Sequence, residues 1–261
     1  MSLVKPAIYE HFHADEKPFV DRAAEWIDRS ARQHELRRTD FLDPRQAQIL
    51  LSLANRSGEV VIRLDGGYSE AERKRAIIAP DYRDVDSEAL ELSVLEVKLS
   101  AKTELDHGDF LGALLGLGIK RDRIGDIHVH DSFAHIVVLD EIASFLNVHL
   151  RQVHRDNVLT EILPIEQLQP VKQQLEEISI TVASMRLDGI ASDVYRLSRT
   201  KIVDPIRAGR CKVNWRTMED PSAALKEGDV VSFKGFGRFK VLEADGVTKK
   251  GRARVKIGKF V

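Results

Sequence analysis

The stretch MRLDGIASDVYRLSRTKIVDPIRAGRCKVNW, residues 185–215, followed by PSAALKEGDVVSFKGFGR, residues 221–238, decides the interpretation of this chain. It predicts a short helix, a second helix that begins at Ser198 and stops at Gly209, and then a run of short strands. Serine is a favoured N-cap and glycine a favoured helix end. Arginine and lysine recur throughout. We therefore look here first for a functional surface.

Charge is distributed unevenly along the chain, although the formal net charge of all 261 residues is only −1. Residues 81–170 hold 8 lysines and arginines against 17 aspartates and glutamates, whereas residues 183–261 hold 18 against 9. Clustered cations neutralise phosphates and release counterions. A basic end after an acidic middle therefore predicts a polyanionic partner for that end alone.

Composition predicts a soluble globular protein, with 43% apolar and 31% charged residues. The single Cys211 excludes an internal disulfide, and the first residues carry acids and no apolar core. The longest apolar run, residues 110–119, is too short to cross a bilayer. We expect a cytoplasmic protein, a monomer, with no membrane partner and no cofactor.

The length predicts more than one hydrophobic core. We expect an α+β protein of three domains: a small α/β N-terminal unit over residues 1–80, a ferredoxin-like domain over residues 81–170, and a basic domain over residues 171–261. In the N-terminal unit, apolar spacing predicts a helix from Lys17 to Leu36, and Asp43-Pro44 predicts the start of a second.

A glycine-rich turn in this unit offers a second place for phosphate. The segment IRLDGGYSEAERKR, residues 62–75, follows the strand predicted at residues 60–64 and ends in Arg73, Lys74 and Arg75. Glycine-rich turns can form anion nests, and the three cations are then secondary RNA contacts. The alternative is an ordinary turn followed by a solvated segment.

The middle of the chain predicts a βαββαβ order, the ferredoxin-like arrangement that RRM-type domains share. The expected elements are strands at 90–99, 126–130, 133–139 and 158–163, with helices at 107–117 and 141–153. RNA-binding sheets of this type stack bases on aromatics. Here the third strand reads FAHIVVL and the domain is acidic. A protein contact or a spacer role is at least as well supported as RNA contact.

Four residues of this domain, His128, His130, Asp131 and His135, raise a metal site as an alternative, because residues two apart on a strand point to one face. No cysteine and no further well-spaced acid completes the set. We therefore predict no metal, and expect a hairpin whose histidines face water.

The last third of the chain predicts one cationic surface for an RNA backbone. Arg199 and Lys201 stand at a helix start, where exposed N–H groups already favour phosphate. The last strand alternates cations with apolar residues, which puts its charges on one face. The candidates from this reasoning are Arg199, Lys201, Arg210, Lys212, Arg216, Arg238, Arg252, Arg254 and Lys256.

Several short runs here resemble the RNA-binding domain named after the small-subunit ribosomal protein S-four. They are Arg186-Leu187-Asp188, Leu197-Ser198-Arg199, Ala208-Gly209 with Val213-Asn214, Pro221-Ser222 and Glu227-Gly228-Asp229-Val230. With FLDPRQAQIL and GGYSEAERKR near its start, the whole chain resembles the YlmH family of bacterial RNA-binding proteins.

This resemblance implies an αL-type module that recognises structured RNA by shape and phosphates. Relatives bind the large ribosomal subunit carrying peptidyl-tRNA, and the family is associated with rescue of stalled translation and with cell division. Ribosomal RNA, with tRNA as a further candidate, is then the expected partner. The contacts it implies are Arg186, Ser198, Arg199, Lys201, Arg207, Arg210, Lys212 and Asn214. Pro205 departs from a regular helix and is expected to kink it.

Two other functions compete with a non-catalytic RNA-binding protein. The same basic domain is attached elsewhere to pseudouridine synthases and RNA methyltransferases, so an RNA-modifying enzyme is the first. The sequence shows no G-x-G-x-x-G after a strand, no P-loop and no nucleophile set, and we predict no catalytic residue. Asp65 is interpreted as a turn residue. A scaffold whose acidic middle binds a protein is the second.

Overall fold

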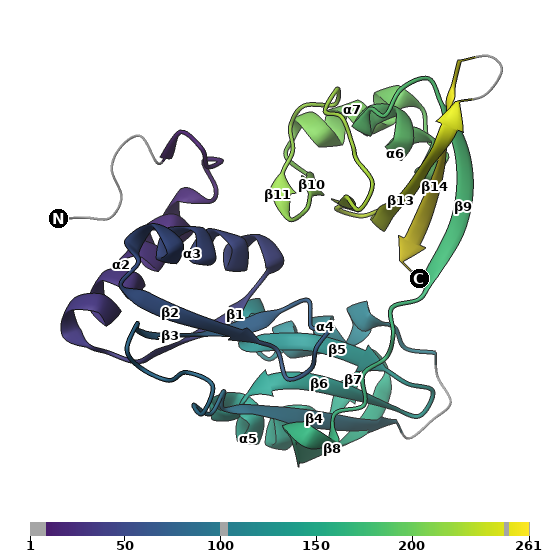
Figure 1. Cartoon of the computed structure of the whole chain (residues 1–261). Helices are drawn as coiled ribbons and strands as arrows, with labels where there is room; N and C mark the ends of the chain where they lie inside the picture. The colour runs from purple at the N-terminus through teal and green to yellow at the C-terminus, as the bar shows by residue number, and fades with distance from the viewer. Residues whose placement is uncertain (1–8, 100–103, 248–250, 261) are drawn as a thin grey trace. The chain divides into compact units, whose positions relative to one another are not determined.

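The computed structural model describes residues 9–99, 104–247 and 251–260 (Figure 1). Helices and antiparallel sheets alternate along the chain, which confirms the α+β class. The chain divides into two compact units, with the main boundary between Val171 and Lys172; His13–Asp15 group with the second unit. The boundary expected near residue 80 falls inside the first unit, so the predicted N-terminal and middle domains pack as one body.

The first part of this unit consists of two helices on a three-stranded sheet. The helices are α2 (Lys17–Gln33) and α3 (Pro44–Ser57), and the strands, in the order β1-β3-β2, are β1 (Arg37–Leu42), β2 (Val60–Asp65) and β3 (Lys74–Pro80). Asp43 caps α3 as predicted, because its carboxylate accepts the backbone N–H of Gln46. Strands β1 and β3 are not anticipated by the sequence analysis.

The second part has the predicted βαββαβ order. Its elements are β4 (Leu92–Leu99), α4 (His107–Gly116), β5 (Ile124–Val129), β6 (Phe133–Leu139), α5 (Asp140–His149) and β8 (Asp156–Pro164), with a short extra strand β7 (Gln152–Val153). The antiparallel sheet runs β5-β6-β4-β8-β7. Both helices cover one face, where Phe110, Leu114 and Leu146 are fully buried.

Part of the opposite face of the five-stranded sheet is covered by the chain itself. Phe41 of β1 packs against Val137 and Leu139 of β6, together with Ile165 and Leu168 after β8. The Phe41 ring lies so close that a Cβ on Gly125 would stand 2.9 Å from it, so only glycine fits there. This part of the face is therefore closed to an outside ligand, whereas Lys98, Leu159 and Glu161 of β4 and β8 remain exposed on the same face.

The second unit is a six-stranded antiparallel sheet with two helices. The sheet order is β11-β10-β12-β13-β14-β9, with β9 (Leu175–Val182), β10 (Cys211–Val213), β11 (Arg216–Thr217), β12 (Val230–Phe233), β13 (Gly237–Val247) and β14 (Ala253–Phe260). Helices α6 (Leu187–Tyr195) and α7 (Arg199–Arg207) bury Ile190 and Ile202 against Phe239 and Val255. Helix α7 continues through Pro205 to Arg207.

No helix within the described ranges is both long and apolar enough to span a bilayer.

Candidate nucleic-acid interface

Exposed cations gather at helix α7 and at the junction before it. Ser198 is the N-cap of α7, as predicted, and its hydroxyl accepts the N–H of Lys201 at 3.4 Å. Arg199 and Lys201 lie in the first turn, where the helix dipole favours anions. We call the exposed residues Arg196, Arg199, Lys201 and Arg207 the helix cations. Within the described ranges they form no ion pair.

Arg186 differs from these, because it is held by an acid of its own helix. Its guanidinium donates to Asp188 at 3.1 and 3.0 Å, and Asp188 is only 5% exposed. These bonds hold the pKa of Asp188 below its usual value and raise the pKa of Arg186. Arg186 thus positions the start of α6. The guanidinium of Arg199 lies beside Gly189 of the same helix, because a Cβ added to Gly189 would stand 3.3 Å from Arg199 Nη2.

The predicted strand residues lie on the other side of the sheet. Lys212, Ser232 and Arg238 are direct register partners across β10, β12 and β13. Their neighbours Val213, Phe233 and Phe239 face the core under α6 and α7, so Lys212 and Arg238 face away from the helices. Arg254 and Lys256 alternate with buried Val255 in the same way.

The expectation of one cationic surface is therefore corrected to two. We call Lys212, Arg238, Arg254 and Lys256 the strand cations, and the sheet separates them from the helix cations. A residue's sequence neighbourhood does not reveal this, because the side of the sheet follows from strand register. Arg216 is exposed on the edge strand β11, and Arg210 precedes β10.

Several strand residues are engaged by their own chain. The guanidinium of Arg238 lies 4.4 Å from the ring centre of Phe260, and Lys256 Nζ lies 2.9 Å from Glu243. Arg252 donates to the carbonyl of Thr181 at 2.6 Å. Such contacts hold a cation in place and reduce its availability to phosphate. Arg254 is exposed and forms no ion pair with any described residue.

Asn214 is also a structural residue. It has a φ of 50°, in the left-handed region that asparagine tolerates well. Its amide donates to Asp229 at 2.8 Å, and its carbonyl accepts the N–H of Val230 at 2.9 Å. The side chain therefore closes the turn after β10 onto β12, and its hydrogen-bonding groups are occupied.

The prediction that Arg73, Lys74 and Arg75 are secondary RNA contacts needs correction for Arg73 and Arg75. Arg73 donates to the carbonyls of Ile124 and Phe41, both at 3.2 Å, and burial lowers its pKa. Arg75 is 8% exposed and donates to Thr39 O at 2.8 Å. Both guanidinium groups tie β1 and β3 to neighbouring segments, so they cannot reach an RNA backbone.

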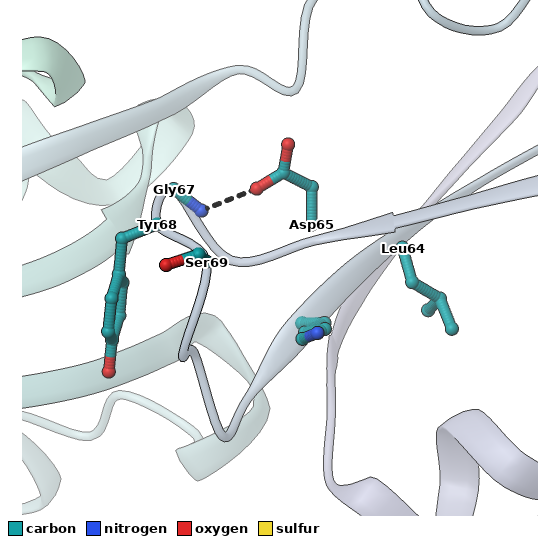
Figure 2. A pocket seen from close by; sticks show the side chains of 6 residues that line it. Leu64, Asp65, Gly67, Tyr68 and Ser69 are labelled. Atoms are coloured by element: carbon teal, nitrogen blue, oxygen red, sulfur yellow. Dashed lines mark hydrogen bonds between the residues drawn. The ribbon is translucent and has the colours of Figure 1, made fainter.

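Lys74 remains partly exposed and lines a hollow of about 320 Å³. Figure 2 shows this hollow at the turn after β2, with Leu64, Asp65, Gly67, Tyr68 and Ser69 around it. Asp65 accepts the N–H of Gly67 at 2.9 Å and pairs with Arg63 at 2.9 Å, as a turn residue does. An acid in the lining makes the hollow a poor phosphate site.

The histidines proposed as an alternative metal site hold a peptide segment instead. His135 Nδ1 accepts the N–H of Gln169 at 3.1 Å, and His128 Nδ1 accepts the N–H of Val171 at 3.2 Å. Both side chains are buried rather than facing water, and burial lowers the pKa of His128. The lone pairs that a metal would need are thus engaged. No group of metal-ligating residues occurs in the described ranges.

Two residues at the interface are missed by the sequence analysis. Arg196 is the C-cap of α6, with a φ of 52°, and lies two residues before Ser198, the N-cap of α7. Phe236 is 39% exposed at the turn between β12 and β13. An arginine two residues before a capping serine and an aromatic residue between two glycines are the signals that could have identified them.

Fold and charge together define an α+β protein whose basic second unit presents exposed cations that form no ion pair with the described residues. Sequence profiles match residues 15–83 as "YlmH, N-terminal" and residues 86–167 as "Putative RNA-binding domain in YlmH". The "Ribosome-associated protein quality control protein P2" of Bacillus subtilis is 38% identical over 249 residues, covering 95% of this chain and 96% of that protein. The chain therefore belongs to the YlmH family.

A solved structure is similar to the larger part of this chain. The "Cell division protein ylmH from Streptococcus pneumoniae" superposes with a TM-score of 0.54 at 28% identity. The match covers 62% of this chain and 99% of that one. The two relatives thus carry names from ribosome-associated quality control and from cell division, and neither name states a reaction.

Proposed function

We propose that this protein is a non-catalytic RNA-binding protein that acts on the ribosome in translation quality control. Its second unit is an S-four-like domain that binds structured ribosomal RNA of the large subunit, with tRNA within reach. One observation carries the proposal: the helix cations are exposed and form no ion pair with the described residues. The quality-control name of the Bacillus subtilis relative supports the ribosome as the place of action.

The second unit is a better RNA surface than the five-stranded sheet of the first. RNA-binding sheets of the ferredoxin-like type use the face away from their helices. In this chain Phe41, Ile165 and Leu168 cover the part of that face around Val137 and Leu139. Residues 81–170 also carry more than twice as many acids as bases, which repels phosphate. We therefore propose that the middle part contributes little to RNA affinity, whatever it contacts on the ribosome.

Of the predicted contacts, we retain the cations that are exposed and form no ion pair with the described residues, and leave out Ser198 and Asn214, whose side chains form the helix cap and the turn described above. The retained cations are Arg199, Lys201, Arg207, Arg210, Lys212, Arg216 and Arg254, with Arg196 added. The helix cations are the principal set, because the dipole at the start of α7 adds to their charge. We further propose that the protein works in the cytoplasm as a monomer without a cofactor, and that any role in cell division follows from its action on translation.

Charge reversal with a matched control tests the proposal. Arg199→Glu with Lys201→Glu changes two exposed side chains at the start of α7. Arg151→Glu with Arg155→Glu makes the same change in net charge at two exposed positions of the five-stranded domain. Each double variant is compared with the unchanged protein for co-sedimentation with purified large ribosomal subunits over a range of salt concentrations.

We expect the Arg199/Lys201 variant to lose roughly 100-fold in affinity, since two charge-assisted contacts are worth about 1.5 kcal/mol each. The slope of log K against log salt should fall by about 2 as two phosphate contacts disappear. The Arg151/Arg155 variant should bind as the unchanged protein does. If instead the Arg151/Arg155 variant loses affinity and the Arg199/Lys201 variant does not, the RNA contact lies in residues 86–167 and the proposal is wrong.

A further inference from the structure

The turn between β12 and β13 holds an aromatic ring at the surface in a fixed position. Phe236 lies between Gly235 and Gly237, whose φ values are 89° and 95°. Only glycine adopts these angles without strain, so both glycines are required for this turn to form. The N–H of Phe236 donates to the carbonyl of Phe233 at 3.0 Å, which closes the turn.

One edge of the Phe236 ring is anchored on the core. Its centre lies 5.5 Å from the ring of Tyr195 and 5.6 Å from the ring of Phe233. Tyr195 in turn donates its hydroxyl to the carbonyl of Gly237 at 3.1 Å. Phe236 nevertheless keeps 39% of its surface exposed. A rigidly supported ring that still reaches solvent is a preformed stacking surface.

Two cations, Arg210 and Lys234, lie at this turn. The N–H of Lys234 donates to the carbonyl of Arg210 at 3.0 Å, and a Cβ on Gly235 would stand 3.8 Å from Arg210 Nη2. Both side chains are exposed, and neither forms an ion pair with the described residues. An aromatic platform flanked by arginine and lysine is the combination that single-stranded RNA sites use.

We propose that residues 234–237 form a stacking site for an unpaired RNA base. Phe236 stacks on the base, while Arg210 and Lys234 contact the adjoining phosphates. The inference rests on the proposed RNA-binding function and adds a preference for unpaired nucleotides. A ring that merely covers Tyr195 and Phe233 would give no such preference.

Four variants at two positions test the site, with affinity for purified large ribosomal subunits as the measurement. Phe236→Ala and Phe236→Leu remove the aromatic face, whereas Phe236→Tyr keeps it. Arg210→Gln removes one flanking charge. The urea midpoint of each variant shows that the second unit is folded, and the leucine variant answers the question if the alanine variant is unstable.

We expect both Phe236→Ala and Phe236→Leu to lose roughly 5- to 150-fold in affinity, with Phe236→Tyr close to the unchanged protein. The salt slope should stay constant for the Phe236 variants and fall by about 1 for Arg210→Gln. Full affinity in Phe236→Leu, or in Phe236→Ala, overturns the stacking site. If Arg199→Glu with Lys201→Glu also binds normally, the proposed function fails; if that variant alone loses binding, only the stacking site fails.

Discussion

Asp126 of β5 joins the two parts of the first unit, and its removal has a calculable cost. Its carboxylate accepts three hydrogen bonds from the turn after β2: from the Tyr68 hydroxyl at 2.8 Å, and from the backbone N–H groups of Glu72 at 2.7 Å and Arg73 at 3.2 Å. Burial, followed by the charge of Asp126, raises the pKa of Tyr68. The contact therefore connects a turn to a strand more than fifty residues away.

Asp126→Ala should destabilise the first unit by about 3 kcal/mol or more. A hydrogen bond to a charged group contributes roughly 1.5 to 3 kcal/mol, and two backbone donors lose their acceptor at once. The Tyr68 hydroxyl is only partly buried and can find water. Asp126→Asn keeps one carbonyl oxygen for Tyr68 and Glu72 but turns its amide against the N–H of Arg73, so about 1 to 2 kcal/mol is expected.

Urea unfolding followed by hydrogen exchange and mass spectrometry can measure the two units separately. Asp131→Ala is the control, because Asp131 is exposed at the tip of the same hairpin and should stay within about 0.5 kcal/mol of the unchanged protein. Peptides from α2 and β3 should shift together with peptides from β5, whereas peptides from α6 should not. A loss of less than about 1 kcal/mol in Asp126→Ala would refute the reasoning.

Two further predictions concern stability. Burial holds the pKa of His128 below its unfolded value of about 6.5, so the unfolded state takes up the proton first and the first unit weakens as the pH falls below that value; urea midpoints at decreasing pH measure this, and a midpoint that rises on acidification would contradict it. Asn214→Ala should destabilise the second unit by about 2 kcal/mol through two lost hydrogen bonds and a left-handed alanine, with a smaller loss for Asn214→Gly. RNA affinity of the folded Asn214→Ala protein should not change, and a specific loss would return Asn214 to the contact set.

Local signals predict the helices well but not every strand. Asp43 and Ser198 begin α3 and α7 because capping depends on residues three positions apart. Strand β3 is not predicted, because its sequence lacks such a local signal. Residues 75–80 are all buried, so the period of two that identifies a half-exposed strand is absent. Its neighbour β1 also lies far away in the sequence, on the other side of α3 and β2, and their pairing is not visible locally.

The same limit applies to the predicted site. A cation in a sequence carries no sign of whether it will meet solvent or a carbonyl. Arg75 reaches the carbonyls of Thr39 and Glu91, each more than ten residues away, and so becomes a structural residue. Arg199 and Lys201 are predicted correctly as exposed, since a helix start has few close neighbours along its own chain. Exposure is thus predictable where the environment is local.

The charge asymmetry between the two units constrains how the proposed contact with a ribosome can be made. Ribosomal RNA presents a dense array of phosphates, which attracts residues 183–261, with twice as many bases as acids, and repels residues 81–170, where acids prevail. If residues 81–170 approached RNA, their repulsion by the phosphates would offset part of the binding free energy that the helix cations contribute. The acidic residues 81–170 suit a basic ribosomal protein instead. Because one chain would make both contacts, each contact would raise the apparent affinity of the other.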